Sequence, residues 1–235
     1  MRNLLWLLPV LLISACTVQQ INQTIDDYLN SDNLTSDEVA SGLREALIKG
    51  ISIGADNASN KDGFFGNSLI RIPFPPDAIK VANTLRDIGL GSEVDKFVMT
   101  LNRGAEDAAK SAKPIFVSAI KRMTIQDAWG ILKGEEDAAT QYLKSATSEP
   151  LYSAFSPIMK NSLQKVDATK YYDDLVTRYN QIPFVEKVNP DLNDYATNLA
   201  MDGLFKLVAI EEAKIRENPA ARTTDLLKRV FGYKE

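Results

Sequence analysis

Apolar residues recur at helical spacing along most of the chain. Val39, Leu43 and Leu47, for example, follow one another at intervals of four residues and so share one face of a helix. Other stretches of this kind are separated by glycine, proline or polar breaks. The pattern predicts an all-α fold, a single helical domain of about eight to ten helices. The expected helices occupy residues 36–56, 77–88, 92–112, 115–123, 125–133, 135–148, 150–166, 169–181, 191–218 and 223–232.

One irregular segment, near residues 57–76, departs from this pattern. It contains the turn-forming pair Asp62-Gly63 and ends in Pro73-Phe74-Pro75-Pro76. Alternation over residues 69–72 predicts a short strand, and Phe64-Phe65 is unusually apolar for a loop. Irregular segments of this length are uncommon unless they bind something or pack against the core. The segment is therefore either a binding edge or, as the more ordinary alternative, a loop that inserts its phenylalanines into the core.

The most apolar stretch after the N-terminus lies inside the expected helix at residues 191–218. From Leu199 to Ile210 only Asp202 and Lys206 interrupt it. Because a helix needs about 20 apolar residues to span a bilayer, this shorter run predicts a buried central helix instead. The two interrupting charges are four residues apart and are expected to pair with each other.

The N-terminus has the pattern of an export signal. Arg2 precedes an uncharged run from Leu4 to Ile13, and the small residues Ser14 and Ala15 follow it. The run is too short to span a bilayer, and the small residues match a cleavage site. We predict a lipoprotein signal peptide at residues 1–15 that is removed from the mature protein.

Cys16 follows the expected cleavage site directly. The sequence Ile13-Ser14-Ala15-Cys16 resembles the lipobox of bacterial lipoproteins, in which the cysteine is acylated after cleavage. The alternative is an ordinary signal peptide that happens to precede a cysteine. Cys16 is the only cysteine of the chain, and an unpaired exported thiol would otherwise be reactive. We therefore predict lipid attachment at Cys16, a lipidated tether at residues 16–34 and a helical domain at residues 35–235.

The residue after Cys16 bears on the destination. The lipoprotein resemblance implies that an Asp at this position retains the product in the inner membrane, whereas here the residue is Thr17. We expect an outer membrane lipid anchor on the periplasmic side, with the inner membrane as the alternative. A flexible tether of this length has a reach of roughly 20 to 25 Å, so the domain is expected to lie close to the membrane.

Charge and composition exclude several classes of function. The chain has 27 basic and 31 acidic residues, and losing Arg2 leaves a net charge of −5. Such an acidic protein is not expected to bind nucleic acid. The sequence has no histidine, which excludes a Ser-His-Asp relay and the usual His and Cys metal sites. We expect no cofactor, no metal site and no catalytic residues, and we favour a protein that is not an enzyme.

Polar residues at helical spacing are the candidates for ligand contacts. Asn102 and Glu106 are four residues apart, as are Arg103 and Asp107, so each pair is expected to point in one direction. The alternative is a solvated face or an ordinary ion pair between helices. The ligand-binding candidates are Asn102, Arg103, Glu106, Glu212, Arg216 and Arg222.

Five short phrases carry a family resemblance. They are Gly63-Phe64, Ile72-Pro73, Leu101 to Glu106, Asp202 to Phe205 and Arg222 to Leu227. Together they resemble the bacterial family catalogued as domain of unknown function 4197, over about Thr35 to Gly232. The resemblance implies an exported, mainly helical protein, often a lipoprotein, of unknown activity. It supplies no catalytic residues.

These observations lead to three hypotheses of function. The leading one is a membrane-anchored envelope lipoprotein, a non-enzymatic binding or structural module for an envelope partner or an apolar ligand. The first alternative is a hydrolase of envelope polysaccharide, which needs two carboxylates about 5 to 10 Å apart across a cleft. Its candidate carboxylates are Glu106, Glu135, Glu211 and Glu212. The second alternative is a homo-oligomeric scaffold.

Overall fold

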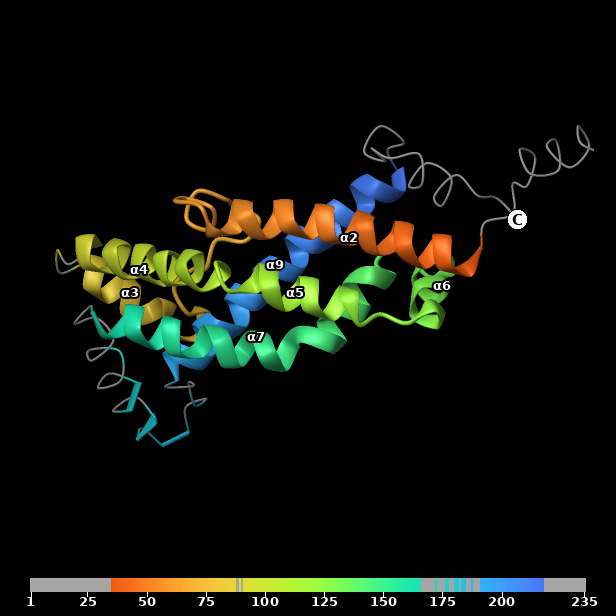
Figure 1. Ribbon diagram of the computed structural model, residues 1–235. Helices are drawn as coiled ribbons and strands as arrows, with labels where there is room; N and C mark the ends of the chain where they lie inside the picture. The colour runs from red at the N-terminus through yellow and green to blue at the C-terminus, as the bar shows by residue number, and fades with distance from the viewer. Residues whose placement is uncertain are drawn as a thin grey trace, which may run out of the picture. The chain divides into compact units, whose positions relative to one another are not determined.

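Helices account for all of the regular structure that the computed structural model describes (Figure 1). The described residues are 35–87, 89, 91–165, 172, 176–177, 180–181, 183–184, 187 and 191–217. Those from Ser36 onward belong to one compact unit. The elements are α2 (Ser36–Ser59), η1 (Pro76–Ala78), α3 (Ile79–Asp87), α4 (Gly91–Ala109), α5 (Ala112–Lys121), α6 (Ile125–Lys133), α7 (Ala138–Gln164) and α9 (Leu192–Glu217).

This architecture confirms the predicted all-α single domain but does not support eight to ten helices. The described part of the chain contains fewer α-helices, and one reason is that the segments expected at residues 135–148 and 150–166 form one helix. The expected helix at residues 169–181 lies largely outside the described residues, and the one at residues 223–232 lies wholly outside them.

The helix α7 is continuous because its buried face outweighs its proline breaks. It includes both Pro150 and Pro157, each of which removes a helical hydrogen bond and destabilises a helix interior by about 3 kcal/mol. Leu143, Leu151 and Phe155 lie on either side of Pro150 and have no exposed surface. Full burial of such side chains contributes roughly 1.5 to 3 kcal/mol each, which offsets the loss. The prediction of a break at Pro150 is therefore wrong.

A capping box starts α6, and a glycine lies at its end. Thr124 Oγ1 accepts a hydrogen bond from Asp127 N at 3.1 Å, and Asp127 Oδ2 accepts one from Thr124 N at 2.8 Å. The helix ends before Gly134, in agreement with the expected range 125–133, but the φ of Gly134 is −79°, so it does not adopt the left-handed conformation typical of a terminal glycine. A Cβ at Gly134 would lie 2.6 Å from Gly130 O, so lack of space explains the glycine.

The helix α9 is the buried central helix that the sequence predicts. It packs against α2, α4 and α7, and crosses the bundle obliquely in Figure 1. Ala200, Leu204 and Val208 are buried along it. Asp202 faces α7, where its Oδ1 lies 4.0 Å from Lys144 Nζ. None of the described helices combines the length and apolar character that a membrane span requires.

Residues 60–75, which join α2 to η1, are irregular as predicted, but the expected strand at residues 69–72 does not form. Ile70 N and Arg71 N both donate to Asn67 O, at 3.2 and 2.8 Å, which makes a turn. The alternation in the sequence reflects burial of Ile70 and Ile72 between exposed neighbours. Phe64 is fully buried, which confirms core insertion for that side chain, whereas Phe65 is only half-buried.

Candidate functional site

The polar face of α4 binds the backbone of residues 62–72, which we call the 62–72 loop. Glu106 Oε1 accepts hydrogen bonds from Phe64 N at 3.2 Å and from Phe65 N at 3.1 Å. One turn earlier, Asn102 Oδ1 accepts from Ile72 N at 2.8 Å, and Asn102 Nδ2 donates to Ile72 O at 2.8 Å. Two side chains on one helical face thus hold both ends of the loop.

These contacts bear on the solvated-face interpretation of the α4 candidates. Asn102 and Glu106 point in one direction, as their spacing predicts, but Asn102 has no exposed surface and Glu106 is 5% exposed. The solvated face offered as the alternative is therefore wrong for this pair. Glu106 anchors the backbone of the 62–72 loop.

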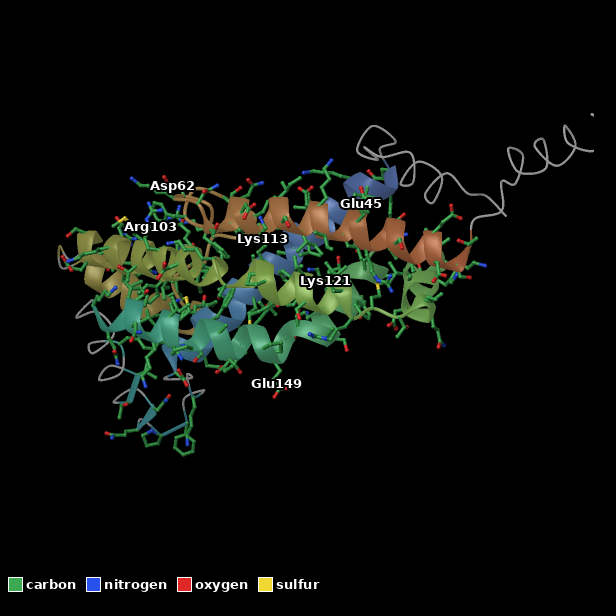
Figure 2. The ribbon with its side chains drawn as sticks, in the orientation of Figure 1. Glu45, Asp62, Arg103, Lys113, Lys121 and Glu149 are labelled. Atoms are coloured by element: carbon green, nitrogen blue, oxygen red, sulfur yellow. The ribbon has the colours of Figure 1, made fainter. Side chains whose placement is uncertain are left out.

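Arg103 joins the same arrangement from the surface. Its Nη1 lies 2.6 Å from Glu106 Oε2, and its Nη2 lies 2.7 Å from Asp62 Oδ1. Figure 2 shows the labelled Asp62 and Arg103 side by side where the loop meets α4. Hydrogen bonds to Glu106, and then to Asp62, raise the pKa of the Arg103 guanidinium. Asp107, four residues after Arg103, pairs with Lys110 at 2.9 Å.

Two guanidinium groups lie over the ring of Phe65. The Cζ atoms of Arg71 and Arg103 are 4.4 and 5.6 Å from its centroid, within the range of a cation–π contact. Phe65 is thus fixed at its amide by Glu106 and at its ring by two cations. Phe65 is therefore held by Glu106 on the side of α4 and by the two arginines at the surface.

The inner side of the loop depends on two glycines. A Cβ on Gly203 of α9 would lie 2.8 Å from Phe64 Cε1 and 3.1 Å from Ile70 Cβ. A Cβ on Gly63 would collide with the carbonyl oxygen of Asn57 in α2. Close approach of loop to helix therefore requires a residue without a side chain at both positions. The 62–72 loop is consequently packed between α2, α4 and α9.

The second group of candidates forms a separate cluster around Glu212. This carboxylate, 4% exposed, accepts from Ala139 N at 2.9 Å, from Thr140 N at 2.8 Å and from Thr140 Oγ1 at 2.7 Å. The first N–H groups of a helix lack partners within the helix, and the adjacent Asp137 provides no side-chain cap here. Glu212 of α9 supplies the missing acceptors, and its negative charge suits the positive end of the α7 dipole.

Arg216 completes this cluster. Its Nε and Nη2 lie 3.0 and 2.8 Å from Glu212 Oε1, and Nη2 also donates to Ile131 O at 2.9 Å. The predicted spacing of Glu212 and Arg216 therefore gives an ion pair in which Glu212 is buried and Arg216 is half-buried. Arg216 connects the end of α6 to the cap of α7, so the cluster fixes the α6–α7 connection onto α9.

A small cavity adjoins Glu212 and Arg216. Its volume is about 10 Å³, which is room for about one water molecule. It is too small for an organic ligand. The remaining residues that line it are Leu43, Leu47, Ile131, Ala139 and Ile215.

The structure brings together three of the predicted site residues in one place and two in another. Asn102, Arg103 and Glu106 hold the 62–72 loop, while Glu212 and Arg216 hold the start of α7. The candidates Arg222 and Cys16 lie outside the described residues. Over the described ranges there is no group of three or more His, Cys, Asp or Glu residues that could hold a metal ion.

Sequence reasoning missed four participants, namely Asp62, Arg71, Thr140 and Gly203. Only Gly203 gives a signal in the sequence, because a glycine inside an apolar helix indicates close packing. Asp62 and Thr140 are separated from their partners Arg103 and Glu212 by 41 and 72 positions. No local pattern connects residues so far apart.

The fold and the two clusters define a class, an all-helical single domain whose buried polar residues bind its own backbone. Four of the five family phrases meet at the 62–72 loop, at Gly63-Phe64, Ile72, Asn102 to Glu106 and Gly203. The chain belongs to the family described as "Protein of unknown function (DUF4197)", whose model matches residues 33–232. Comparison with curated proteins and with solved structures gave no match.

Proposed function

We propose that this protein is a lipid-anchored, non-enzymatic module of the bacterial envelope that binds an envelope protein partner. The observation that carries the non-enzymatic part is the use of Glu106 and Glu212. Each accepts hydrogen bonds from two backbone N–H groups of the chain, and each also pairs with an arginine. A general acid or base needs an oxygen within reach of a substrate proton, and neither buried carboxylate offers one.

The anchoring part of the proposal is supported by the sequence around Cys16. The lipobox resemblance, the single cysteine and Thr17 favour a lipid anchor in the outer membrane, facing the periplasm. One acyl chain gives only reversible membrane binding, whereas several chains on one cysteine give stable attachment. The module would then act within the reach of residues 16–34 from the leaflet.

An envelope partner is favoured over an apolar ligand. The cavity beside Glu212 has room for about one water molecule and does not support storage of a lipid-like ligand. Phe64, one of the two apolar side chains noted in the candidate binding edge near residues 57–76, is fully buried. What the loop offers to a partner is its outer surface, where Arg71 and Leu69 are exposed.

The anchor is tested by labelling cells with radioactive palmitate. The native protein is expected to carry label and to fractionate with the outer membrane, and the variant Cys16→Ser is expected to carry none. A native protein without label would refute the anchor. Affinity purification of the lipidated protein from its envelope, followed by mass spectrometry, is expected to recover a protein partner. A reproducible small molecule in place of a protein would instead favour the apolar-ligand version.

The two alternatives have separate tests. A polysaccharide hydrolase would release sugar fragments from envelope material and lose that activity in Glu106→Gln or Glu212→Gln, whereas the module has no such activity to lose. A homo-oligomeric scaffold would show a multiple of the chain mass in solution for a form that lacks Cys16. No described contact favours either one.

A further inference from the structure

The helix α6 turns an apolar face outward. Ile125, Trp129 and Leu132 follow one another at intervals of four and three residues, so they lie on one side of the helix. Ile125 is 41% exposed, and the other two are half-buried. Ala128 and Ile131, on a neighbouring side of the helix, are buried against the rest of the domain. The outward face, which we call the α6 face, is therefore an additional apolar surface beyond the one that holds α6 in the fold.

The α6 face has the side-chain chemistry of a lipid interface. Lys133 Nζ lies 5.2 Å from the centre of the Trp129 ring. Tryptophan favours the boundary between headgroups and acyl chains because its ring is apolar and its N–H is polar. A lysine beside it can lay its methylene stem along the apolar surface and keep its charge in water. Lys121 and Arg122, just before α6, are exposed as well.

The position of α6 matches where the chain reaches the domain. It packs against α2, and Figure 1 shows it beside the end of α2 at which the chain enters. That end is Ser36, twenty positions after Cys16, so the length of the intervening chain limits the distance between the proposed lipid and this end of the domain to at most roughly 70 Å. A domain held within this distance by its Ser36 end can bring the neighbouring α6 to the leaflet without rearrangement.

Charge does not attract this end of the domain to anionic lipid. The exposed cations Lys121, Arg122 and Lys133 are balanced by Asp127, which is half-buried, and by three exposed carboxylates. These three are Glu135, Glu136 and Asp137. Apolar contact must therefore carry any docking, and a zwitterionic phospholipid surface is the fitting partner.

We propose that the α6 face docks onto the leaflet that holds the lipid of Cys16, with Ile125, Trp129 and Leu132 entering the headgroup boundary. The inference rests on the proposed lipid anchor. It deepens that proposal, because docking gives the tethered domain one fixed orientation. The 62–72 loop, which is not part of the docked face, is then free to meet a partner.

The protein contains its own reporter for this contact. The sequence has two tryptophans, and Trp6 lies in the signal peptide, so Trp129 is the only one in the mature lipoprotein. The native lipidated protein is reconstituted into phosphatidylcholine vesicles with brominated acyl chains, which quench nearby indole fluorescence. Docking is expected to shift Trp129 emission to shorter wavelength and to quench it. Salt is expected to have little effect.

Two matched double variants test which surface is responsible. Ile125→Ser with Leu132→Ser removes the apolar neighbours of Trp129 and is expected to lower the ratio of docked to undocked domain at least about tenfold. That factor corresponds to about 1.4 kcal/mol. Ile53→Ser with Leu69→Ser removes side chains that are 43% and 63% exposed elsewhere. Ile53 is 17 positions after Ser36, roughly 25 Å along α2, so this control is expected to dock normally.

The outcomes separate this inference from the anchor. Quenching in the native protein and the control, but not in the α6 variant, supports docking, provided that circular dichroism shows equal helix content in all three. A lipidated native protein that floats with the vesicles while Trp129 stays unquenched overturns docking and leaves the anchor intact. Equal quenching of native protein and α6 variant also overturns it. A native protein that carries no lipid overturns the proposed function itself.

Discussion

Replacing Gly203 with alanine tests whether the 62–72 loop is held as the contacts indicate. Gly203 is in the middle of α9, where glycine is about 1 kcal/mol less favourable than alanine. On helix propensity alone, Gly203→Ala would therefore stabilise the protein. The structure predicts the opposite sign, because the added methyl group has no room.

The size of the effect follows from the contacts around the missing methyl. A Cβ at this position would lie 2.8 Å from Phe64 Cε1 and 3.1 Å from Ile70 Cβ. Phe64 is fully buried, and its amide is fixed by Glu106, so the ring cannot simply turn away. Overpacking of this kind costs typically 1 to 3 kcal/mol. After the gain in helix propensity, we expect a net loss of about 1 to 2 kcal/mol.

The assay is urea unfolding of the mature chain without Cys16, followed by circular dichroism. Gly130→Ala in α6 is the matched control, because a Cβ at Gly130 meets nothing within 4 Å. That variant is expected to gain about 0.5 to 1 kcal/mol. Amide exchange adds a local readout, since Phe64 N–H should exchange faster in Gly203→Ala only. If Gly203→Ala is as stable as the native chain or more so, the packing argument is refuted.

Three further predictions concern other contacts. Glu212→Ala removes the carboxylate from a mostly buried ion pair with Arg216 and takes the acceptors from the start of α7, so it is expected to cost about 3 kcal/mol in urea unfolding. Asp107→Ala, in an exposed pair, should cost less than about 1 kcal/mol, and equal losses would contradict this. Thr197 is fully buried, and its hydroxyl finds no hydrogen-bond partner in the described part of the chain, so Thr197→Val should raise the unfolding free energy by about 1 kcal/mol, and a loss would refute it. Hydrogen bonds from the Thr124 amide and hydroxyl lower the pKa of Asp127, so its contribution to stability is present at neutral pH and is lost as pH falls through the lowered value. The Tm difference between the native chain and Asp127→Asn should therefore be positive at neutral pH and vanish in acid, and a pH-independent difference would contradict the cap.

The sequence predicts the local features of the fold well because those features depend on neighbours in the chain. Helical spacing places Asn102 and Glu106 on one face, and the Thr124 cap depends on a residue three positions away. The prediction fails where distant segments decide the outcome. Burial on both sides of Pro150 continues α7, and no neighbouring strand is present in the described segments to pair with residues 69–72.

The candidate site shows the same division. Spacing correctly relates Glu212 to Arg216, but it cannot show that the carboxylate caps a helix that begins more than 70 positions earlier. It also cannot distinguish an amide that faces solvent from one that binds a distant backbone. The burial of Asn102 follows from its bonds to Ile72, 30 positions away.

The residues of the family phrases have structural roles at the 62–72 loop. Gly203 admits Phe64, Glu106 and Asn102 bind the loop backbone, and Arg103 closes the loop from outside. Each of these residues has a role in the fold, so sharing them with a family predicts a shared loop geometry. A catalytic site is usually recognised by polar groups that the fold leaves available. Here Asn102, Glu106 and Glu212 bind backbone groups of the chain. The surfaces that do not pack against the rest of the fold, above all the α6 face, are therefore the better guide to what the domain contacts.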